Sequence, residues 1–289
     1  MVDNAVKMKF IMIDTREKQL DIKKDFQDLF LDAFKKPMSD VQWEHFYINC
    51  PVGQTISFVC YDGALMVAHG GLIPQRLLSK SGEKIDYFLQ TAIMVREKYQ
   101  TLVLFKELLD RMTDYVTNHR SFVVAYPNKN TYLPFVKMLG WRMVRQYDIG
   151  QYVVKEGAVT EEKIGEQSDF EYEINKDAQF IRWRGESNGS KSLKTADFEI
   201  IYKDYYGSLE ILDVSVSGKD IRIQVCDILK QLGCNSVNVA ECFLGLITLD
   251  GLAFNKKVGI PQRMCFYPAE YDECRYDRIR PSLLISDVF

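Results

Sequence analysis

The feature that most restricts the fold is a succession of elements that occurs twice along the chain. In the first half, an apolar strand ends near Val95, and a helix, a strand and a second helix follow before Gly140. In the second half, a strand ends near Val214, and we expect a helix over 219–232, a strand and another helix before Gly259. Each glycine follows its valine at the same distance along the chain. The repeated order predicts an internal structural duplication, with two related lobes.

The hydrophobic pattern inside each half is that of a mixed α/β protein, a mixed sheet with helices on its faces. Apolar residues recur at helical spacing near the N-terminus, whereas 54–73 contains two strands that turn at an Asp-Gly pair, a common hairpin signal. A polar, acidic stretch separates the halves. We therefore predict an N-terminal domain over 1–154, a linker over 155–176 and a C-terminal domain over 177–289, packed together.

The composition is that of an ordinary globular protein and excludes several classes. Of 289 residues, 47% are hydrophobic and the net charge is −3, so we expect no nucleic-acid partner and no attraction to an anionic membrane. The N-terminus lacks a secretory pattern and no apolar run could span a bilayer, which predicts a cytoplasmic protein without membrane insertion. The seven cysteines form no CxxC pair, so neither a disulfide framework nor a metal site is expected.

Residues 88–118 predict a strand, a loop and an amphipathic helix in immediate succession. The strand is the run "FLQTAIMV", and the loop "REKYQT" opens the helix. A second motif, "VVAYPNKN", ends another strand, and "KMLGW" ends the helix after it. These segments resemble a domain of the GNAT superfamily of acyl-CoA-dependent N-acyltransferases, over about residues 20–154. The residues that match the family pattern are Val95, Tyr99, Gln100, Pro127, Asn128, Gly140 and Trp141.

The resemblance implies a GNAT-like acyltransferase fold and acyl-CoA as co-substrate. In the family, amides of the loop bind the CoA pyrophosphate, and a splayed strand directs an amide at the thioester carbonyl. Carried over to this chain, the splayed strand supplies Ile93 and Val95, and Asn128 flanks the pantetheine arm. The second half resembles the degenerate partner domain of tandem members of the family.

The loop departs from the family where arginine and glycine are usual. Gln100 stands in place of the arginine, and Thr101 and Val103 in place of the glycines. Amides belong to the backbone, however, and a helix N-terminus offers about four of them with roughly half a positive charge. We therefore expect Gln100 and the amides of Thr101, Leu102, Val103 and Leu104 to bind CoA. The alternative is an ordinary helix start that has lost CoA binding.

Two residues are candidates for proton transfer. His69 ends a strand beside a double glycine and titrates near neutrality, so we assign it as general base, with a buried structural histidine as the alternative. The tyrosine that serves as acid in the family corresponds to Val136. Tyr132, which follows "PNKN", is the candidate to replace it near the departing thiolate, and helix packing is its alternative role.

Four residues are candidates for binding the acceptor. Trp43 and Tyr47 share a helix face and form either a platform for a nucleobase or part of the core. Gln90 is a polar side chain in an apolar strand, where it binds a sugar hydroxyl or faces solvent at a sheet edge. Arg184 adjoins an aromatic residue and binds a phosphate or forms a salt bridge between the lobes.

Together these features predict an N-acyltransferase that binds acyl-CoA in its N-terminal lobe and a primary amine between the lobes. From the resemblance, the best acceptor is the amino group of a dTDP- or UDP-linked deoxyamino sugar, as used in surface polysaccharide biosynthesis. One alternative is a peptidyltransferase that uses aminoacyl-tRNA, which the net charge of −3 disfavours. Another is a GNAT-like module that binds without catalysis. A homodimer is also left open.

Overall fold

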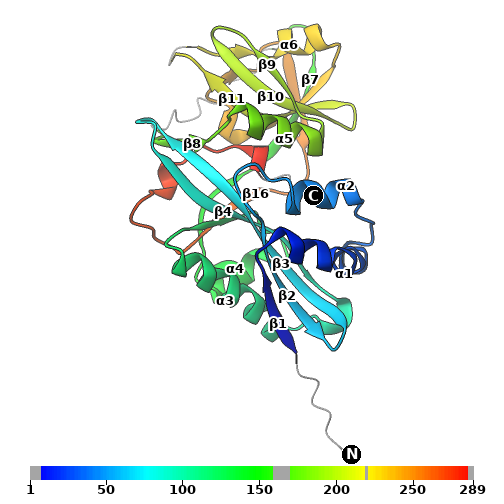
Figure 1. The fold of residues 1–289 in the computed structure, drawn as a ribbon. Coiled ribbons are helices and arrows are strands. Elements are labelled where there is room, and N and C mark those ends of the chain that lie inside the picture. Colours follow the sequence, from blue (N-terminus) through cyan, green and yellow to red (C-terminus); the bar gives the residue numbers. More distant parts are fainter. Residues whose placement is uncertain (1–7, 159–169, 219–220, 286–289) are drawn as a thin grey trace, which may run out of the picture.

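The computed structural model describes residues 8–158, 170–218 and 221–285, and it contains two large sheets, each flanked by helices (Figure 1). The first sheet has the strand order β1-β2-β3-β4-β5-β16-β6, and β8 pairs with β3. Its strands are β1 (Lys9–Ile13), β2 (Ile56–Asp62), β3 (Leu65–Ser79), β4 (Lys84–Val95), β5 (Val123–Ala125), β16 (Gln262–Tyr267), β6 (Arg142–Tyr147) and β8 (Tyr172–Ile174).

Helices cover both faces of the first sheet (Figure 1). One face carries α1 (Arg16–Phe34) and α2 (Asp40–Tyr47), and the other carries α3 (Leu102–Asn118) and α4 (Tyr132–Met138). Hydroxyl side chains define where three of these helices begin. Thr15 caps α1, Ser39 forms a capping box with Gln42 at α2, and Thr101 caps α3.

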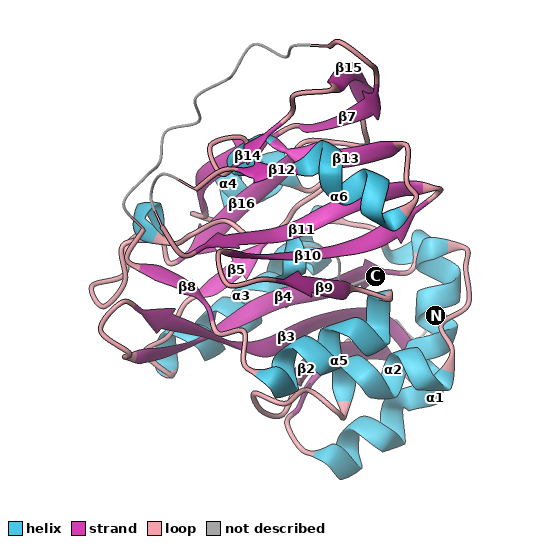
Figure 2. Ribbon diagram, turned by 90° about the horizontal axis from the view of Figure 1, so that it is seen from above, coloured by secondary structure: helices cyan, strands magenta, loops and turns pink. Residues whose placement is uncertain are grey.

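The second sheet has the order β15-β7-β13-β11-β10-β9, which Figure 2 shows as a row of strands. Its strands are β15 (Leu252–Lys257), β7 (Ile149–Val154), β13 (Ser236–Ala240), β11 (Ser208–Val216), β10 (Phe198–Tyr205) and β9 (Lys191–Lys194). The remaining elements are α5 (Ala178–Asn188), α6 (Val225–Leu232), the short strands β12 (Ile223–Gln224) and β14 (Ile247–Thr248), and the 3-10 turns η1 (Glu97–Tyr99), η2 (Glu241–Phe243), η3 (Tyr276–Arg278) and η4 (Leu283–Ile285).

Two strands lie on the other side of the boundary that we predicted. Strand β7 was expected in the N-terminal domain, but it pairs with β13 and β15 in the second sheet. Strand β16 was expected in the C-terminal domain, but it pairs with β5 and β6 in the first sheet. The lobes therefore exchange strands, and the limits at residues 154 and 177 do not separate the sheets.

Helix α5 also joins the two halves. Its Phe180 and Trp183 are buried in the first core cluster, against α1 and α2. The Trp183 indole stacks on His45 of α2, with ring centroids 4.8 Å apart, and donates a hydrogen bond of 3.0 Å to the His45 carbonyl. A segment from the second half thus completes the core of the first.

The repeated plan is visible in the order of strands. In the first sheet, antiparallel β3 and β4 are followed by parallel β5; in the second, antiparallel β10 and β11 are followed by parallel β13. The next positions are filled by β16 and β7, the two exchanged strands. One expected helix is wrong, because β15 precedes Gly259. The helix expected over 219–232 begins only at Val225 in the described residues.

Candidate active site

Strands β4 and β5 separate soon after they meet. Their parallel pairing covers only Phe88 with Val123 and Leu89 with Val124, and β4 continues to Val95 without β5. On its other edge, β4 remains paired with β3 as far as Val95. The last part of β4 therefore has one open edge.

A break in register at the end of β4 directs backbone groups toward this open edge. The β3–β4 pairing shifts between His69 and Gly71, and Ala92 has the unusual φ of 45°. After the shift, the Arg96 amide donates to Val67 of β3. Because backbone groups alternate along a strand, the amides of Ile93 and Val95 point away from β3. Ile93 and Val95 are the residues of the splayed strand from which we expected an amide donor to the thioester carbonyl.

The N-terminus of α3 follows this open edge after one turn of 3-10 helix. Thr101 caps the helix, and its Oγ1 accepts a hydrogen bond of 3.2 Å from the Leu104 amide. That amide, which we expected to bind phosphate, is therefore already engaged. The amides of Leu102 and Val103 have no partner within the described residues, and both side chains are exposed.

The loop does not require glycine in this conformation. Residues 96–104, all of them described, contain no positive φ, and Thr101 is extended at φ −124° and ψ 150°. The loop is held by its own side chains. Gln100 Nε2 donates to the Val95 carbonyl at 3.2 Å, and the Tyr99 hydroxyl donates to Asp62 at 2.7 Å. Arg96 donates to the Met66 carbonyl at 2.9 Å, so it holds the loop on β3.

Strands β11 and β13 of the second lobe separate in the same way, but there the C-terminal segment occupies the space. Parallel pairing of β11 with β13 covers only two residue pairs, and the β10–β11 register also shifts. Arg280 donates to the Val214 carbonyl and to Asp213, the latter at 2.9 Å, and Ser282 donates to Asp213 at 2.5 Å. Leu284 is fully buried nearby. The C-terminal segment thus occupies the end of β11, which leaves the first lobe as the candidate site.

Solved structures share this architecture. A GCN5-related N-acetyltransferase from Kribbella flavida is 12% identical, with a TM-score of 0.62, and the match covers 91% of this chain and 72% of that one. One from Anabaena variabilis is 10% identical, with a TM-score of 0.60 and coverage of 91% and 73%. Eis1 from Mycobacterium abscessus is 8% identical, with a TM-score of 0.57 and coverage of 89% and 73%. The chain has the fold of the GCN5-related N-acetyltransferases.

At 8–12% identity, these structures are similar to the chain in fold and not in sequence. No protein-family model and no curated protein sequence matches the chain. In this GNAT fold the described helices include none that is long and apolar enough to cross a membrane. Among the described residues, no three His, Cys, Asp or Glu side chains gather in a way that could hold a metal ion.

The structure does not support His69 as general base. Its side chain is fully buried on the face covered by α1 and α2, against the rings of Phe26 and Tyr47. Nδ1 lies 2.9 Å from the Ala92 carbonyl and Nε2 lies 3.1 Å from Ser57 Oγ, so both ring nitrogens are engaged. Burial lowers the pKa of His69 to about 4. A buried imidazole with both nitrogens engaged cannot collect a proton from an acceptor amine.

Tyr132 and Asn128 lie where strand β5 gives way to α4. Asn128 is exposed, and its Oδ1 accepts from the amides of Asn130 and Thr131 at 2.9 and 3.2 Å. Tyr132 is the first residue of α4 and is half-buried, with the Arg263 guanidinium 4.8 Å from its ring centroid. This position allows Tyr132 either to pack against Arg263 or to donate a proton. The Asn128 side chain stabilises the turn before α4.

The four candidate acceptor residues do not form one surface. Trp43 and Tyr47 are buried in the first core cluster, where their rings stack 5.5 Å apart, so no nucleobase reaches them in this conformation. Arg184 is 1% exposed. Gln90 pairs with Leu72, whose side chain belongs to the cluster on the opposite face, beside α3. The platform and phosphate assignments are therefore not supported.

Sequence reasoning missed two tyrosines near the end of β5. Tyr126 follows β5 directly, and Tyr147 ends β6; each hydroxyl is buried and has no partner within the described residues. Burial raises the pKa of both phenols, and the pKa of Tyr126 also responds to Tyr147 and to Cys242 of the second lobe. The only sequence signal was the position of Tyr126 before the "PN" motif. Unpartnered buried hydroxyls between lobes are costly unless a ligand or water satisfies them.

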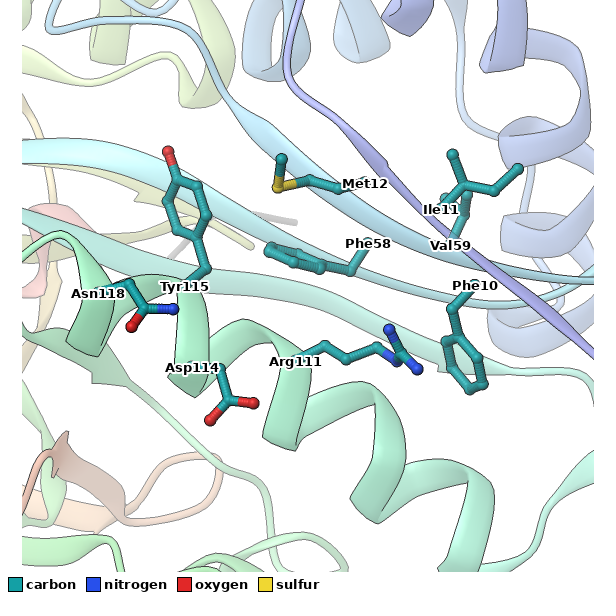
Figure 3. Close-up of a pocket in the computed structure, with 9 residues that line it drawn as sticks. All are labelled: Phe10, Ile11, Met12, Phe58, Val59, Arg111, Asp114, Tyr115 and Asn118. Carbon is teal, nitrogen blue, oxygen red and sulfur yellow. The ribbon is translucent and has the colours of Figure 1, made fainter.

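A pocket of about 310 Å³ lies away from this site, between edge strand β1, β2 and the C-terminal half of α3 (Figure 3). Phe10, Met12 and Phe58 form its apolar side, and Arg111 and Asp114 of α3 form its polar side. The N-terminus of α3 and the open edge of β4 do not line it. The pocket therefore takes no part in the chemistry considered below.

Proposed function

We propose that the protein is an acyl-CoA-dependent N-acyltransferase that acylates a primary amine. The observation that carries this proposal is the open edge of β4, where the Ile93 and Val95 amides point away from β3. The amides of Leu102 and Val103, which have no partner within the described residues, follow this edge. One pair of amides suits a thioester and its pantetheine arm, and the other suits a pyrophosphate. The fold shared with N-acetyltransferases supports the same reaction.

In this reaction the chain contributes position and hydrogen bonds. The Ile93 amide would donate to the carbonyl oxygen of the thioester and stabilise the negative charge that develops there. The amine nitrogen forms a bond to the acyl carbon, the carbon–sulfur bond breaks, and CoA leaves as a thiolate that takes up a proton. Tyr132 is the proposed donor of that proton, because it begins the helix beside Asn128.

The amine must lose a proton, and His69, the base that we expected, is buried with both ring nitrogens engaged. Tyr126 and Tyr147 carry phenols with raised pKa, which suit hydrogen bonding and not proton removal near neutral pH. We propose that water accepts the proton. An amine of low basicity, such as a sugar amine, reacts this way most easily because more of it is unprotonated at neutral pH.

For the acceptor we propose a nucleotide-linked deoxyamino sugar, made in the cytoplasm for surface polysaccharide. The resemblance of the "QTAIMVREKY" stretch supports this class, and the two buried phenols would suit a polyhydroxylated ligand. A peptidyltransferase that uses aminoacyl-tRNA is disfavoured by the net charge of −3. A binding module without catalysis is the remaining alternative.

The test has two stages. Isothermal titration with CoA and acetyl-CoA would first measure binding, and a thiol-release assay would then screen dTDP- and UDP-linked amino sugars against simple amines. We expect CoA to bind and an amino sugar to increase thiol release. Binding without turnover on any amine would favour the non-catalytic module. No binding of CoA would refute the proposed function.

A further inference from the structure

A chain of three buried polar side chains leads to the register break in β4. Gln19 of α1, Ser57 of β2 and His69 of β3 are all fully buried. Gln19 Nε2 lies 3.0 Å from Ser57 Oγ, which lies 3.1 Å from His69 Nε2, and His69 Nδ1 lies 2.9 Å from the Ala92 carbonyl oxygen. Gln19 also donates to the Thr55 carbonyl at 2.9 Å. This series of hydrogen bonds ends at the Ala92 carbonyl oxygen, a backbone atom of the candidate site.

The direction of these hydrogen bonds follows from their chemistry. A carbonyl oxygen can only accept, so His69 Nδ1 carries the proton that it donates to Ala92. A neutral imidazole then accepts at Nε2, so the single hydroxyl proton of Ser57 is directed at it and not at Gln19 Oε1, which lies 3.2 Å away, and Gln19 Nε2 donates to Ser57. The lowered pKa of His69 agrees with a neutral ring. The imidazole is therefore held in one tautomer and one orientation.

Holding the Ala92 carbonyl also fixes the next amide. The peptide bond between Ala92 and Ile93 is planar and trans, so its C=O and N–H point in opposite directions. His69 belongs to β3, so when it holds the Ala92 carbonyl toward β3, the Ile93 N–H must point away from β3. That direction leads to the open edge of β4, where the proposed thioester carbonyl lies.

The geometry at Ala92 explains why such a hold is needed. A φ of 45° is a strained conformation for a non-glycine residue, so it persists at Ala92 only if its surroundings hold it. Gly71 leaves the space required, because a Cβ there would come 3.0 Å from Thr91 Cγ2 and 3.5 Å from His69 Cε1. Of these two contacts only the one with Thr91 is tight, so Gly71 makes room for Thr91, the residue before Ala92, and a Cβ at Gly71 would only touch His69.

We propose that His69 is a positioning residue, which aims the Ile93 amide at the thioester carbonyl by holding the Ala92 carbonyl, with Ser57 and Gln19 fixing its tautomer. This inference rests on the proposed acyltransferase function. It assigns to His69 no proton transfer with the acceptor. Its effect on rate acts through the hydrogen bond that Ile93 donates as charge develops on the carbonyl oxygen.

The experiment compares His69→Leu, His69→Asn and Ser57→Ala, with His119→Leu as matched control. His119 also places Nδ1 against a backbone carbonyl, that of Tyr115 at 2.8 Å, but lies exposed at the end of α3. Asn keeps a donor near the position of Nδ1, whereas Leu removes it. Readouts are kcat and KM for acetyl-CoA from pH 6 to 9, and the infrared stretch of a ¹³C-labelled acetyl carbonyl bound without acceptor.

We expect His69→Leu to lower kcat about 10- to 100-fold with KM for acetyl-CoA nearly unchanged, because a misdirected donor weakens transition-state stabilisation more than ground-state binding. The bound carbonyl should absorb at higher frequency, since its hydrogen bond is weakened. His69→Asn should restore most of both signals, Ser57→Ala should lie between, and His119→Leu should match the wild type.

Three results would overturn the inference. The first is an unchanged kcat and carbonyl frequency in folded His69→Leu. The second is a loss of kcat in His69→Asn as large as in His69→Leu. The third is a loss of kcat in His69→Leu that disappears at high pH, which would indicate a general base. If the Leu variant does not fold, the Asn and Ser57 variants decide by the same criteria. A wild-type protein that binds no acetyl-CoA would instead refute the proposed function itself.

Discussion

Replacing Leu102 with proline removes one proposed phosphate donor and little else. Leu102 is the first residue of α3 after its cap, a position where proline is well tolerated and where the amide has no intrahelical partner. The preceding Thr101 is extended at φ −124° and ψ 150°, which is the conformation that a following proline favours. The Leu102 side chain is 50% exposed, so its removal costs little packing.

The expected loss follows from the single missing hydrogen bond. A hydrogen bond to a charged group contributes about 1.5–3 kcal/mol, so the Kd for CoA should rise about 10- to 100-fold. Isothermal titration would measure this for CoA and for acetyl-pantetheine, which lacks the pyrophosphate. Leu102→Ala is the matched control, because it shortens the same side chain and keeps the amide. Only the proline variant should lose affinity, and only for CoA.

Two outcomes would contradict this assignment of the pyrophosphate. A Leu102→Pro protein with a wild-type melting temperature and an unchanged Kd for CoA would show that this amide is not used. An equal loss of affinity for CoA and acetyl-pantetheine would show that the substitution acts through the open edge of β4 and not through the phosphate.

Three further predictions concern stability. A fragment of residues 1–160 should aggregate, because it lacks β16, which joins β5 to β6; a soluble fragment with cooperative unfolding would contradict the exchange of strands. Asp213→Ala should cost about 1–3 kcal/mol in urea unfolding, because Arg280 and Ser282 lose a buried acceptor while Glu173, 3.0 Å from Arg280, still balances its charge; the exposed Asp277→Ala should cost less than about 1 kcal/mol. The pKa of His69 in the folded protein lies near 4, below its ordinary 6.5, so the neutral ring stabilises the fold fully above pH 6.5 and progressively less as pH falls toward 4. Over this range the free energy of unfolding of the wild type should fall by up to about 3 kcal/mol more than that of His69→Asn. Equal losses for the two proteins would show that folding does not lower the pKa of His69.

The fold could be predicted largely because its signals are local and repeated. The run ending at Val95, the capped helix after it and the later glycine form a pattern that the second half repeats. The exchange of β7 and β16 could not be predicted, because an apolar strand pattern shows which faces are buried but not which strand lies alongside. The polar stretch that begins near residue 155 separates the two halves in sequence, but each sheet contains a strand from the other half.

The candidate site was predictable where it depends on the backbone. Amides at Leu102 and Ile93 follow from a helix start and a strand end, whatever the side chains are. His69 was misassigned because its place beside the double glycine indicated closeness to the site but not the face of the sheet. Tyr126 was missed because the side chains around its hydroxyl, among them Tyr87, Tyr147 and Cys242, come from distant parts of the sequence.

The exchange of strands has a consequence for how the protein is made. Strand β6 ends at Tyr147, and its neighbour β16 begins only at Gln262, near the end of the chain. At about 5–20 residues per second, the ribosome needs on the order of 10 s to cover that interval. Until then β5 and β6 have exposed edges, which are prone to pair with other chains. We therefore expect newly made chains to depend on chaperones, and stalled or truncated chains to aggregate.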